Sequence, residues 1–248
     1  MADEKIGAVL VVGGGIAGIQ AALDAAEFGF KVYLIDHSSS IGGVMAQLDK
    51  TFPTNDCSMC ILAPKLVEAG RHPNINVITN AELTGLSGEA GNFEANILKR
   101  SRYIREEKCN GCGLCAQKCP VEAVDAYNKG LSDRSAIHID YPQAVPLKYM
   151  IDREKCIGCG ICQGVCKAGA IEYEQAESDL TLKVGSVIVA PGFESFDASH
   201  KTEYGYGRFQ NIVTSIEFER ILNASGPYGG LILRPSDGEI PKKIAFIQ

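Results

Sequence analysis

The sequence predicts an α/β protein: a Rossmann-like dinucleotide-binding domain into which a second, cysteine-rich α+β module is inserted. A glycine-rich turn lies between the first apolar strand and the first helix, two matching cysteine runs occupy the middle of the chain, and another apolar strand follows them. We therefore divide the chain into a dinucleotide-binding domain (residues 1–103 and 175–240), the inserted module (104–174), and the opening strand of a further element (241–248).

The stretch "IGAVLVVGGGIAGIQAALDAAEFGFKVYLID" predicts strand, glycine turn, helix and strand. Gly13, Gly15 and Gly18 form G-x-G-x-x-G directly after the apolar strand at 8–12. The first glycine permits the tight turn, the second lets the backbone approach a pyrophosphate, and the third lets helix and strand pack closely. Asp36 ends the second strand near the ~20-residue offset at which an acid binds a ribose hydroxyl. A similar turn without a ligand is the alternative, but the surrounding elements favour a dinucleotide site.

Later features favour FAD over NAD as that dinucleotide. Gly42 and Gly43 form a pair beyond the acid, as in two-dinucleotide-fold flavoproteins. "NINVITNAEL" predicts a third parallel strand, and the backbone near Glu82 at its end is expected to approach the adenine. "LKVGSVIVAPGFESF" is similar to the strand and turn by which a flavin domain returns to its sheet, so Pro191 and Gly192 join the predicted site.

Ten cysteines without a secretory signal indicate metal ligation rather than a disulfide framework. Eight of them form two C-x2-C-x2-C-x3-C runs, the bacterial ferredoxin pattern in which the fourth cysteine of each run binds the other cluster. We therefore assign the ligands of two [4Fe–4S] clusters as Cys109, Cys112, Cys115 and Cys166 for the first, and Cys156, Cys159, Cys162 and Cys119 for the second. Structural zinc is the alternative, but zinc sites usually present two separated C-x2-C pairs.

Glycines within the two runs are expected to turn the backbone tightly and to bring amide N–H groups near the sulfurs: Gly111, Gly113, Gly158 and Gly160. The connection between the runs, residues 128–150, is expected to be a loop or short hairpin. Because both ends of the module are rooted in the flavin sheet, the clusters are expected to lie at a defined distance from the flavin.

Charge and hydropathy exclude several classes of function. The net charge of -6 argues against general nucleic-acid binding, which requires a basic face. Apolar runs such as "AVLVV" have the length of a strand, so no membrane insertion is expected. The acidic start is no signal peptide, which predicts a cytoplasmic protein. We expect the basic run "KRSRYIR" (99–105) to be a solvated strand edge, and four histidines to be surface or loop residues: His37, His72, His138 and His200.

The chain resembles the A-subunit family of heterodisulfide reductases. The resemblance rests on "VVGGGIAGIQAALDAAEFGFKVYLID", "FPTNDCSMCILAPKL", the inserted double cysteine run, and "YGYGRFQNIVTSIEFERIL" with "RPSDG" after it. It implies an FAD and iron–sulfur electron-transfer subunit of a large soluble complex, with a hydrogenase, formate or NADH-linked donor module, iron–sulfur and disulfide-reducing subunits, and ferredoxin as partners. In some relatives the flavin bifurcates electrons. The resemblance makes Gly13, Gly15, Gly18, Asp36 and Gly43 FAD contacts and the eight repeated cysteines cluster ligands.

The remaining pair, Cys57 and Cys60, has three interpretations. The resemblance suggests ligands of a further cluster shared with another segment or chain, since two thiolates cannot complete a four-thiolate site. A redox-active C-x-x-C disulfide near the flavin is the second interpretation, and a structural or zinc-binding pair is the third. Residues 53–56 predict a turn ahead of a helix that begins near Cys57.

The sequence thus predicts an electron-transfer flavoprotein subunit that works only within a complex. No residue is assigned as a catalytic acid or base. A flavin-dependent disulfide reductase that uses Cys57 and Cys60, and a ferredoxin-like carrier with a vestigial flavin fold, are the alternatives. Because flavoproteins of this architecture need a later segment to close the flavin site, we expect the sequence to be the N-terminal part of a longer protein or one piece of a split subunit.

Overall fold

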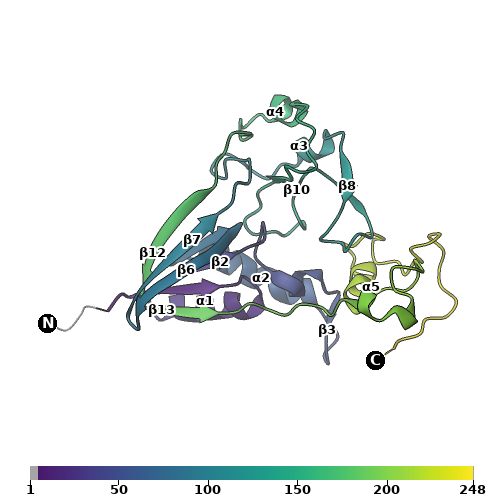
Figure 1. Cartoon of the computed structure of the whole chain (residues 1–248), viewed down its shortest axis with the longest axis horizontal. Helices are drawn as coiled ribbons and strands as arrows, with labels where there is room; N and C mark the ends of the chain where they lie inside the picture. The colour runs from purple at the N-terminus through teal and green to yellow at the C-terminus, as the bar shows by residue number, and fades with distance from the viewer. Residues whose placement is uncertain (1–4, 248) are drawn as a thin grey trace.

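Four parallel strands form the sheet at the base of the molecule (Figure 1). The computed structural model describes residues 5–247. The strand order is β13-β1-β2-β5, with β1 at Ala8–Val12, β2 at Lys31–Asp36, β5 at Ile75–Thr79 and β13 at Ser186–Val189. All three pairings are parallel. This order places the strand that follows the cysteine runs beside the strand that opens the chain.

Two helices cover one face of this sheet and a second sheet covers the other. α1 (Ile16–Glu27) and α2 (Ser58–Arg71) pack on the face formed by alternate residues such as Val9 and Val11. Leu10 points to the opposite face, into a second core shared with the antiparallel sheet. Burial on both faces explains why the strands are apolar almost throughout.

The antiparallel sheet has the order β12-β7-β6, with β6 at Ala81–Glu89, β7 at Asn92–Lys99 and β12 at Ser178–Val184. β7 and β12 are hydrogen-bonded neighbours, although the whole cysteine-rich module lies between them in sequence. The chain leaves the sheet after Lys99 and returns at Ser178, its register partner. An isolated bridge between Ile104 and Ile171 joins the two ends of the module.

The module rises above the sheets as the apex of the molecule in Figure 1. Its elements are short: α3 (Leu114–Gln117), β8 (Glu122–Val124), β9 (Asp133–Ser135), β10 (Ile137–His138), β11 (Met150–Ile151) and α4 (Ile161–Val165). β8 pairs with β9, and β10 with β11. Its small core joins apolar side chains such as Ile137 and Ile151 to the buried Cys115 and Cys162. The connection between the cysteine runs is therefore partly β-structure.

The remaining elements are short. They are the 3-10 helices η1 (Gly43–Gln47), η2 (Ala198–His200) and η3 (Thr202–Tyr204), the hairpin strands β3 (Lys50–Thr51) and β4 (Asp56–Cys57), and α5 (Ser215–Leu222). A capping box between Thr214 and Glu217 starts α5. Within the described part of the chain, residues 241–247 form no strand, and that they open a further element stays a prediction. Gln248, the last residue of that predicted element, lies outside the described part.

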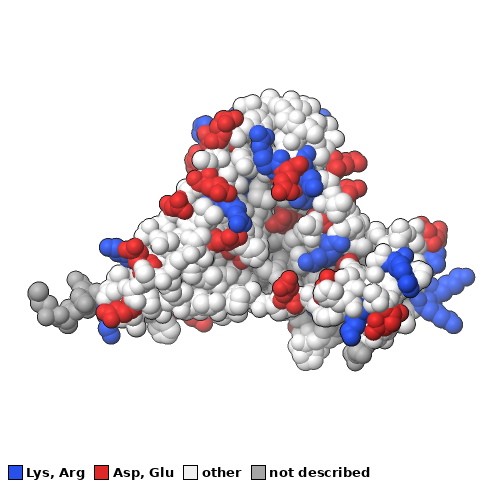
Figure 2. Space-filling view, viewed as in Figure 1, with Lys and Arg blue, Asp and Glu red and all other residues white. Residues whose placement is uncertain are grey.

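Two other predictions about polar residues are wrong. Arg102, in the basic run expected to be solvated, is only 1% exposed, because its guanidinium lies between the end of the parallel sheet and the module. His138, expected at the surface, is 5% exposed, because it lies inside the module next to Arg134 and Asp140. Elsewhere acidic and basic side chains are interspersed over the face that Figure 2 shows. Within residues 5–247, the helices are too short or too polar to cross a bilayer.

Candidate functional site

The three glycines of the first turn occupy positions with distinct steric demands. Gly13 has φ 106°, and a Cβ there would lie 2.1 Å from the Ala190 carbonyl oxygen. A Cβ on Gly18 would lie 1.8 Å from the Gly13 oxygen, so the helix packs against the turn at backbone distance. A Cβ on Gly15 would meet nothing within 4 Å. The turn is therefore closed on two sides and open at Gly15, where a dinucleotide pyrophosphate would meet the start of α1.

Asp36 fastens this turn to the end of β2. Its Oδ2 accepts a hydrogen bond of 2.6 Å from the Gly14 amide, and its Oδ1 accepts one of 2.7 Å from the Ser38 amide. The carboxylate is buried. A carboxylate offers about four lone-pair sites, so acceptors remain for a ribose hydroxyl. The sequence predicted the cofactor contact of Asp36 but not its hold on the turn.

Changing Asp36 to asparagine is expected to raise the dissociation constant for FAD roughly 10- to 100-fold, as for a lost charge-assisted hydrogen bond. The amide NH2 would face one of the two backbone donors that the carboxylate now accepts. Quenching of flavin fluorescence measures the constant. Asp24→Asn on the exposed face of α1 is the control. An unchanged constant for Asp36→Asn would remove this residue from the site.

A second turn packs on the first. The Gly42 amide donates to the Gly14 carbonyl over 2.7 Å. Gly42 and Gly43 have φ of 133° and 57°, and a Cβ on Gly43 would lie 2.9 Å from the Gly15 Cα. The predicted glycine pair therefore lies directly against the open position of the first turn.

The other predicted FAD contacts are Pro191, Gly192 and Glu82. The Ala190 amide donates to the Val12 carbonyl over 2.8 Å, which places Pro191 and Gly192 at the carboxyl ends of the parallel strands beside Gly13. Glu82 lies in β6, and its carboxylate is bound by Arg100 at 2.6 and 3.0 Å. The Glu82 side chain is therefore engaged, and only its backbone is left for the predicted adenine contact.

A cleft that the sequence did not predict opens next to the glycine pair. It lies between η1, the segment that follows β13, and the start of α5, and its lining includes Val44, Gln47, Phe193, Phe196, Tyr206 and Glu217. The Tyr206 hydroxyl donates to Glu217 Oε1 over 2.8 Å, and this hydrogen bond raises the pKa of Tyr206 to about 12. Aromatic side chains with a few polar groups are typical of a cofactor site. No local sequence pattern identifies this cleft, because segments far apart in the sequence form it, including Lys129 of the inserted module.

The repeated cysteines gather around two cavities in the module. One is lined by Cys109, Cys112, Cys115 and Cys166. The other is lined by Cys156, Cys159, Cys162 and Cys119. Each cavity thus draws three cysteines from one run and the fourth from the other, and four thiols around one cavity are the donor set of a [4Fe–4S] cluster.

The backbone around these cavities favours a metal-bound thiolate. Gly111 and Gly113 have positive φ, as do Gly158 and Gly160 in the second run. The Gly158 amide points at Cys156 Sγ over 3.4 Å. Burial raises the pKa of Cys115 to about 12, so a thiolate there requires a cation to offset its desolvation.

Cys57 and Cys60 lie away from both cavities, at the start of α2. The structure joins them as a disulfide, and Cys57 caps the helix by accepting a hydrogen bond from the Cys60 amide. Among the described residues the eight other cysteines line the two cavities. Among the described residues, no further cysteine is therefore left to complete a four-thiolate site with Cys57 and Cys60.

Comparison with known proteins bears directly on this geometry. A family model described as FAD dependent oxidoreductase matches residues 8–58, which carry both glycine turns. A family model described as 4Fe-4S binding domain matches residues 102–125 and 149–172, one match for each cysteine run. FAD and two [4Fe–4S] clusters are therefore the cofactors of this chain, and the predicted fold class, a two-dinucleotide-binding-type FAD domain with an inserted two-[4Fe–4S] ferredoxin module, is confirmed.

Curated relatives match almost the whole chain. The A-subunit of the H(2):CoB-CoM heterodisulfide,ferredoxin reductase of Methanothermobacter marburgensis is 52% identical over 99% of this chain and 37% of its own length. An iron–sulfur A-subunit of the CoB–CoM heterodisulfide reductase of Methanopyrus kandleri is 55% identical over 98% of this chain and 37% of its own length. The A-subunit of the ferredoxin:CoB-CoM heterodisulfide reductase of Methanosarcina mazei is 46% identical over 97% and 30%.

Solved structures align over a smaller part: the L-proline dehydrogenase from P. horikoshii covers 37% of this chain and 19% of its own, with a TM-score of 0.33 and 24% identity. The curated relatives are far longer than the sequence, which spans little more than a third of the first of them. By sequence, the chain is similar to A-subunits of heterodisulfide reductases over the third or so of their length that it matches.

Proposed function

We propose that this chain is the flavin and iron–sulfur core of an electron-transfer subunit in an oxidoreductase complex of the heterodisulfide reductase type. The observation that carries the proposal is the place of insertion. Two four-cysteine cavities lie in a module that is inserted between β7 and β12, two hydrogen-bonded neighbours in the antiparallel sheet of the flavin domain. The bridge between Ile104 and Ile171 holds the two ends of the module together. When bound, FAD supplies exchange of electrons in pairs or singly, and the clusters supply single-electron exchange.

The residues of the chain would bind and position these groups. Gly13, Gly15, Gly18, Gly42 and Gly43 would approach FAD with their backbone, Asp36 would accept from its ribose, and the Pro191–Gly192 turn and the Glu82 backbone would complete the contacts. The two cysteine sets would hold the clusters crosswise. The described residues then serve binding and orientation, with the cofactors supplying the chemistry.

The names of the relatives support a proposal for the partners. They mention H2, formate, ferredoxin and the CoB–CoM heterodisulfide. We propose that this chain works beside iron–sulfur, disulfide-reducing and donor subunits of this kind in the cytoplasm, with ferredoxin as one acceptor and with bifurcation of electron pairs at the flavin. A ferredoxin-like carrier that works without flavin would need neither the first glycine turn nor the Gly42–Gly43 turn.

The test is the cofactor content of the full polypeptide, purified anaerobically with its partners. We expect about one FAD and at least about eight irons per polypeptide, and reduction of the clusters after the flavin is reduced by a donor. Eight irons without flavin would indicate the carrier with a vestigial flavin fold. Flavin without iron would overturn the proposal.

For the pair at the start of α2, we propose that Cys57 and Cys60 supply two thiolates to a further [4Fe–4S] cluster whose other ligands lie outside these residues. Changing both to serine is expected to remove about four irons while flavin stays near one per polypeptide. Thr54→Ala, in the same exposed turn, is the control.

The disulfide in the structure supports a second candidate for this pair, a flavin-dependent disulfide reductase. In that case the double serine variant keeps its iron, loses two titratable thiols after reduction, and no longer reduces a disulfide reagent. This outcome would replace the cluster proposal for Cys57 and Cys60.

A further inference from the structure

We propose that Tyr127 and Tyr141, both in the inserted module, are positioning residues for FAD: they hold segment 41–47 in its binding form, so that flavin affinity depends on a folded cluster module. The inference rests on the proposed function. Segment 41–47 carries the glycine pair that packs on the first glycine turn. It lies in the flavin domain, yet several of its hydrogen bonds are made with residues 127–145 of the module.

Tyr141 holds the start of the segment. It is 4% exposed, and its hydroxyl donates to the carbonyl of the fully buried Ile41. The Ile41 amide in turn donates to the Val145 carbonyl over 2.9 Å. A Cβ on Gly42 would lie 2.6 Å from the Tyr141 hydroxyl, so the phenol lies directly against the turn that contacts Gly14. The first glycine turn, the glycine pair and Tyr141 are thus stacked in three layers.

Tyr127 holds the end of the segment. Its hydroxyl donates to the Ala46 carbonyl over 2.7 Å, and its own carbonyl accepts from the Gln47 side chain over 3.4 Å. Its ring stacks on that of Tyr141 with centroids 5.5 Å apart. The guanidinium of Arg220 in α5 lies 5.1 Å from the ring centroid and donates to the Gln47 carbonyl. Burial raises the pKa of both phenols, so both remain hydrogen-bond donors at neutral pH.

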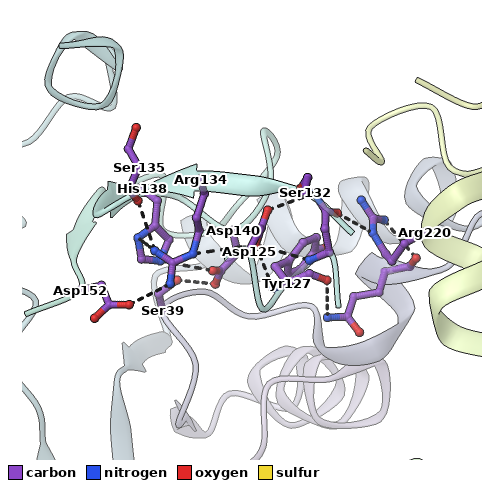
Figure 3. A network of polar contacts seen from close by, with 12 residues as sticks. Ser39, Asp125, Tyr127, Ser132, Arg134, Ser135, His138, Asp140, Asp152 and Arg220 are labelled. Atoms are coloured by element: carbon purple, nitrogen blue, oxygen red, sulfur yellow. Dashed lines mark hydrogen bonds and ion pairs between the residues drawn. The ribbon is translucent and has the colours of Figure 1, made fainter. Parts of the chain in front are cut away.

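The module holds the neighbourhood of both tyrosines in turn, and Figure 3 shows the contacts around Tyr127 and Asp140. The Tyr127 amide donates to Asp125 Oδ1 over 2.9 Å, in the turn before β9. Beside Tyr141, Asp140 accepts a 2.5 Å hydrogen bond from the Ser39 hydroxyl of the flavin domain. His138 lies between Asp140, at 3.8 Å, and Arg134, at 2.6 Å. With the ion pair between Arg134 and Asp125 at 3.9 Å, these contacts make one partly buried network that crosses the boundary between module and flavin domain.

The same network reaches the second cysteine run. Arg134 pairs with Asp152 at 3.1 Å, and the Asp152 carbonyl accepts from the Cys156 amide over 2.9 Å. A cluster that orders Cys156 therefore also orders the backbone at Asp152, whose side chain pairs with Arg134. Since coupling between two binding sites is reciprocal, cluster loading should raise FAD affinity and FAD should protect the clusters.

The experiment uses the full polypeptide with its partners, purified anaerobically with its clusters and stripped of flavin. In Tyr127→Phe/Tyr141→Phe the rings and their packing remain and only the hydroxyls are lost. We expect each lost hydroxyl to raise the dissociation constant for FAD roughly three- to tenfold, at unchanged iron content. Tyr204→Phe, whose ring is 48% exposed, is the control. A purely structural role would lower the melting temperature without moving this constant.

A second measurement separates this inference from the function on which it rests. Wild-type protein whose clusters have been removed by oxidation and chelation should bind FAD more weakly than cluster-loaded protein. In the double variant, removing the clusters should change the dissociation constant for FAD much less. FAD binding that is equally tight in wild type and in both single variants overturns the inference and leaves the proposed function intact. A wild-type protein that binds no FAD overturns the proposed function itself. If the double variant loses iron, the dissociation constant for FAD of the single Tyr141→Phe variant decides whether the inference holds.

Discussion

Replacing Cys166 by alanine is expected to remove one whole cluster, about four irons, and it should be the cluster whose other ligands lie in the first cysteine run. Cys166 belongs by sequence to the second run, but it lines the cavity of Cys109, Cys112 and Cys115. Without its fourth thiolate this cavity keeps three cysteines, and the buried Cys115 loses the cation that its thiolate requires. Gln163→Ala, on the exposed side of α4, is the control and should keep all the iron.

Paired variants reveal the crossing itself. If the ligands cross, Cys166→Ala combined with Cys109→Ala removes the same cluster twice and leaves about four irons in the module, whereas Cys166→Ala combined with Cys156→Ala removes both clusters. If each run held its own cluster, these two results would be exchanged. Iron and sulfide analysis distinguishes the two arrangements without any assay of activity.

Replacing Arg102 by methionine is expected to lower the free energy of unfolding by about 3–5 kcal/mol, the range found when a buried charged network loses one partner. Arg102 is 1% exposed and donates to three acceptors. Two belong to the flavin domain, the Ser39 carbonyl and the Thr79 hydroxyl, and the third is the Lys148 carbonyl of the module. Burial lowers the pKa of the guanidinium, and Glu106 at 3.7 Å partly offsets this. Methionine fills much of the volume but leaves these acceptors unpaired.

The matched control for Arg102 lies two residues earlier. Arg100 makes a bidentate pair with Glu82, but its side chain is 51% exposed. Arg100→Met should therefore cost less than about 1 kcal/mol, as exposed pairs usually do. Urea unfolding of the two variants compares them under identical conditions. Equal losses would show that burial between the two parts gives Arg102 no special role.

Elements specified by local spacing could be predicted from the sequence, and contacts between distant segments could not. The strand–turn–helix around Gly13 and the sorting of Cys119 and Cys166 follow from spacings of a few residues, so the pattern alone carries them. Burial of Arg102 and His138 depends on what packs against them. A basic run looks solvated in sequence because nothing within it indicates that three carbonyl and hydroxyl groups converge on one of its members.

The connection between the cysteine runs shows the same limit. Its sequence contains no repeat or motif, and we expected only a loop or hairpin there. In the structure this connection supplies Asp140 and Tyr141 to the flavin domain, and Tyr127 directly before it makes a further contact. These are single hydrogen bonds to backbone or serine, which place no constraint on the partner sequence. Only the arrangement in space reveals that this segment contacts the flavin domain as well as its own module.

The place where the module enters the fold has a consequence for biosynthesis. β7 and β12 are neighbours, but residues 100–177 must be made between them, and β13 follows later still. Closing so long an unfolded loop carries an entropic cost, which a folded module removes by bringing Ile104 and Ile171 together. Because the apolar core of the module is so small, we expect its folding to depend on its metal. During translation, therefore, iron–sulfur assembly is expected to precede completion of the flavin sheet, and cells starved of iron should accumulate chains that have all their sequence but lack their last parallel strand pairing.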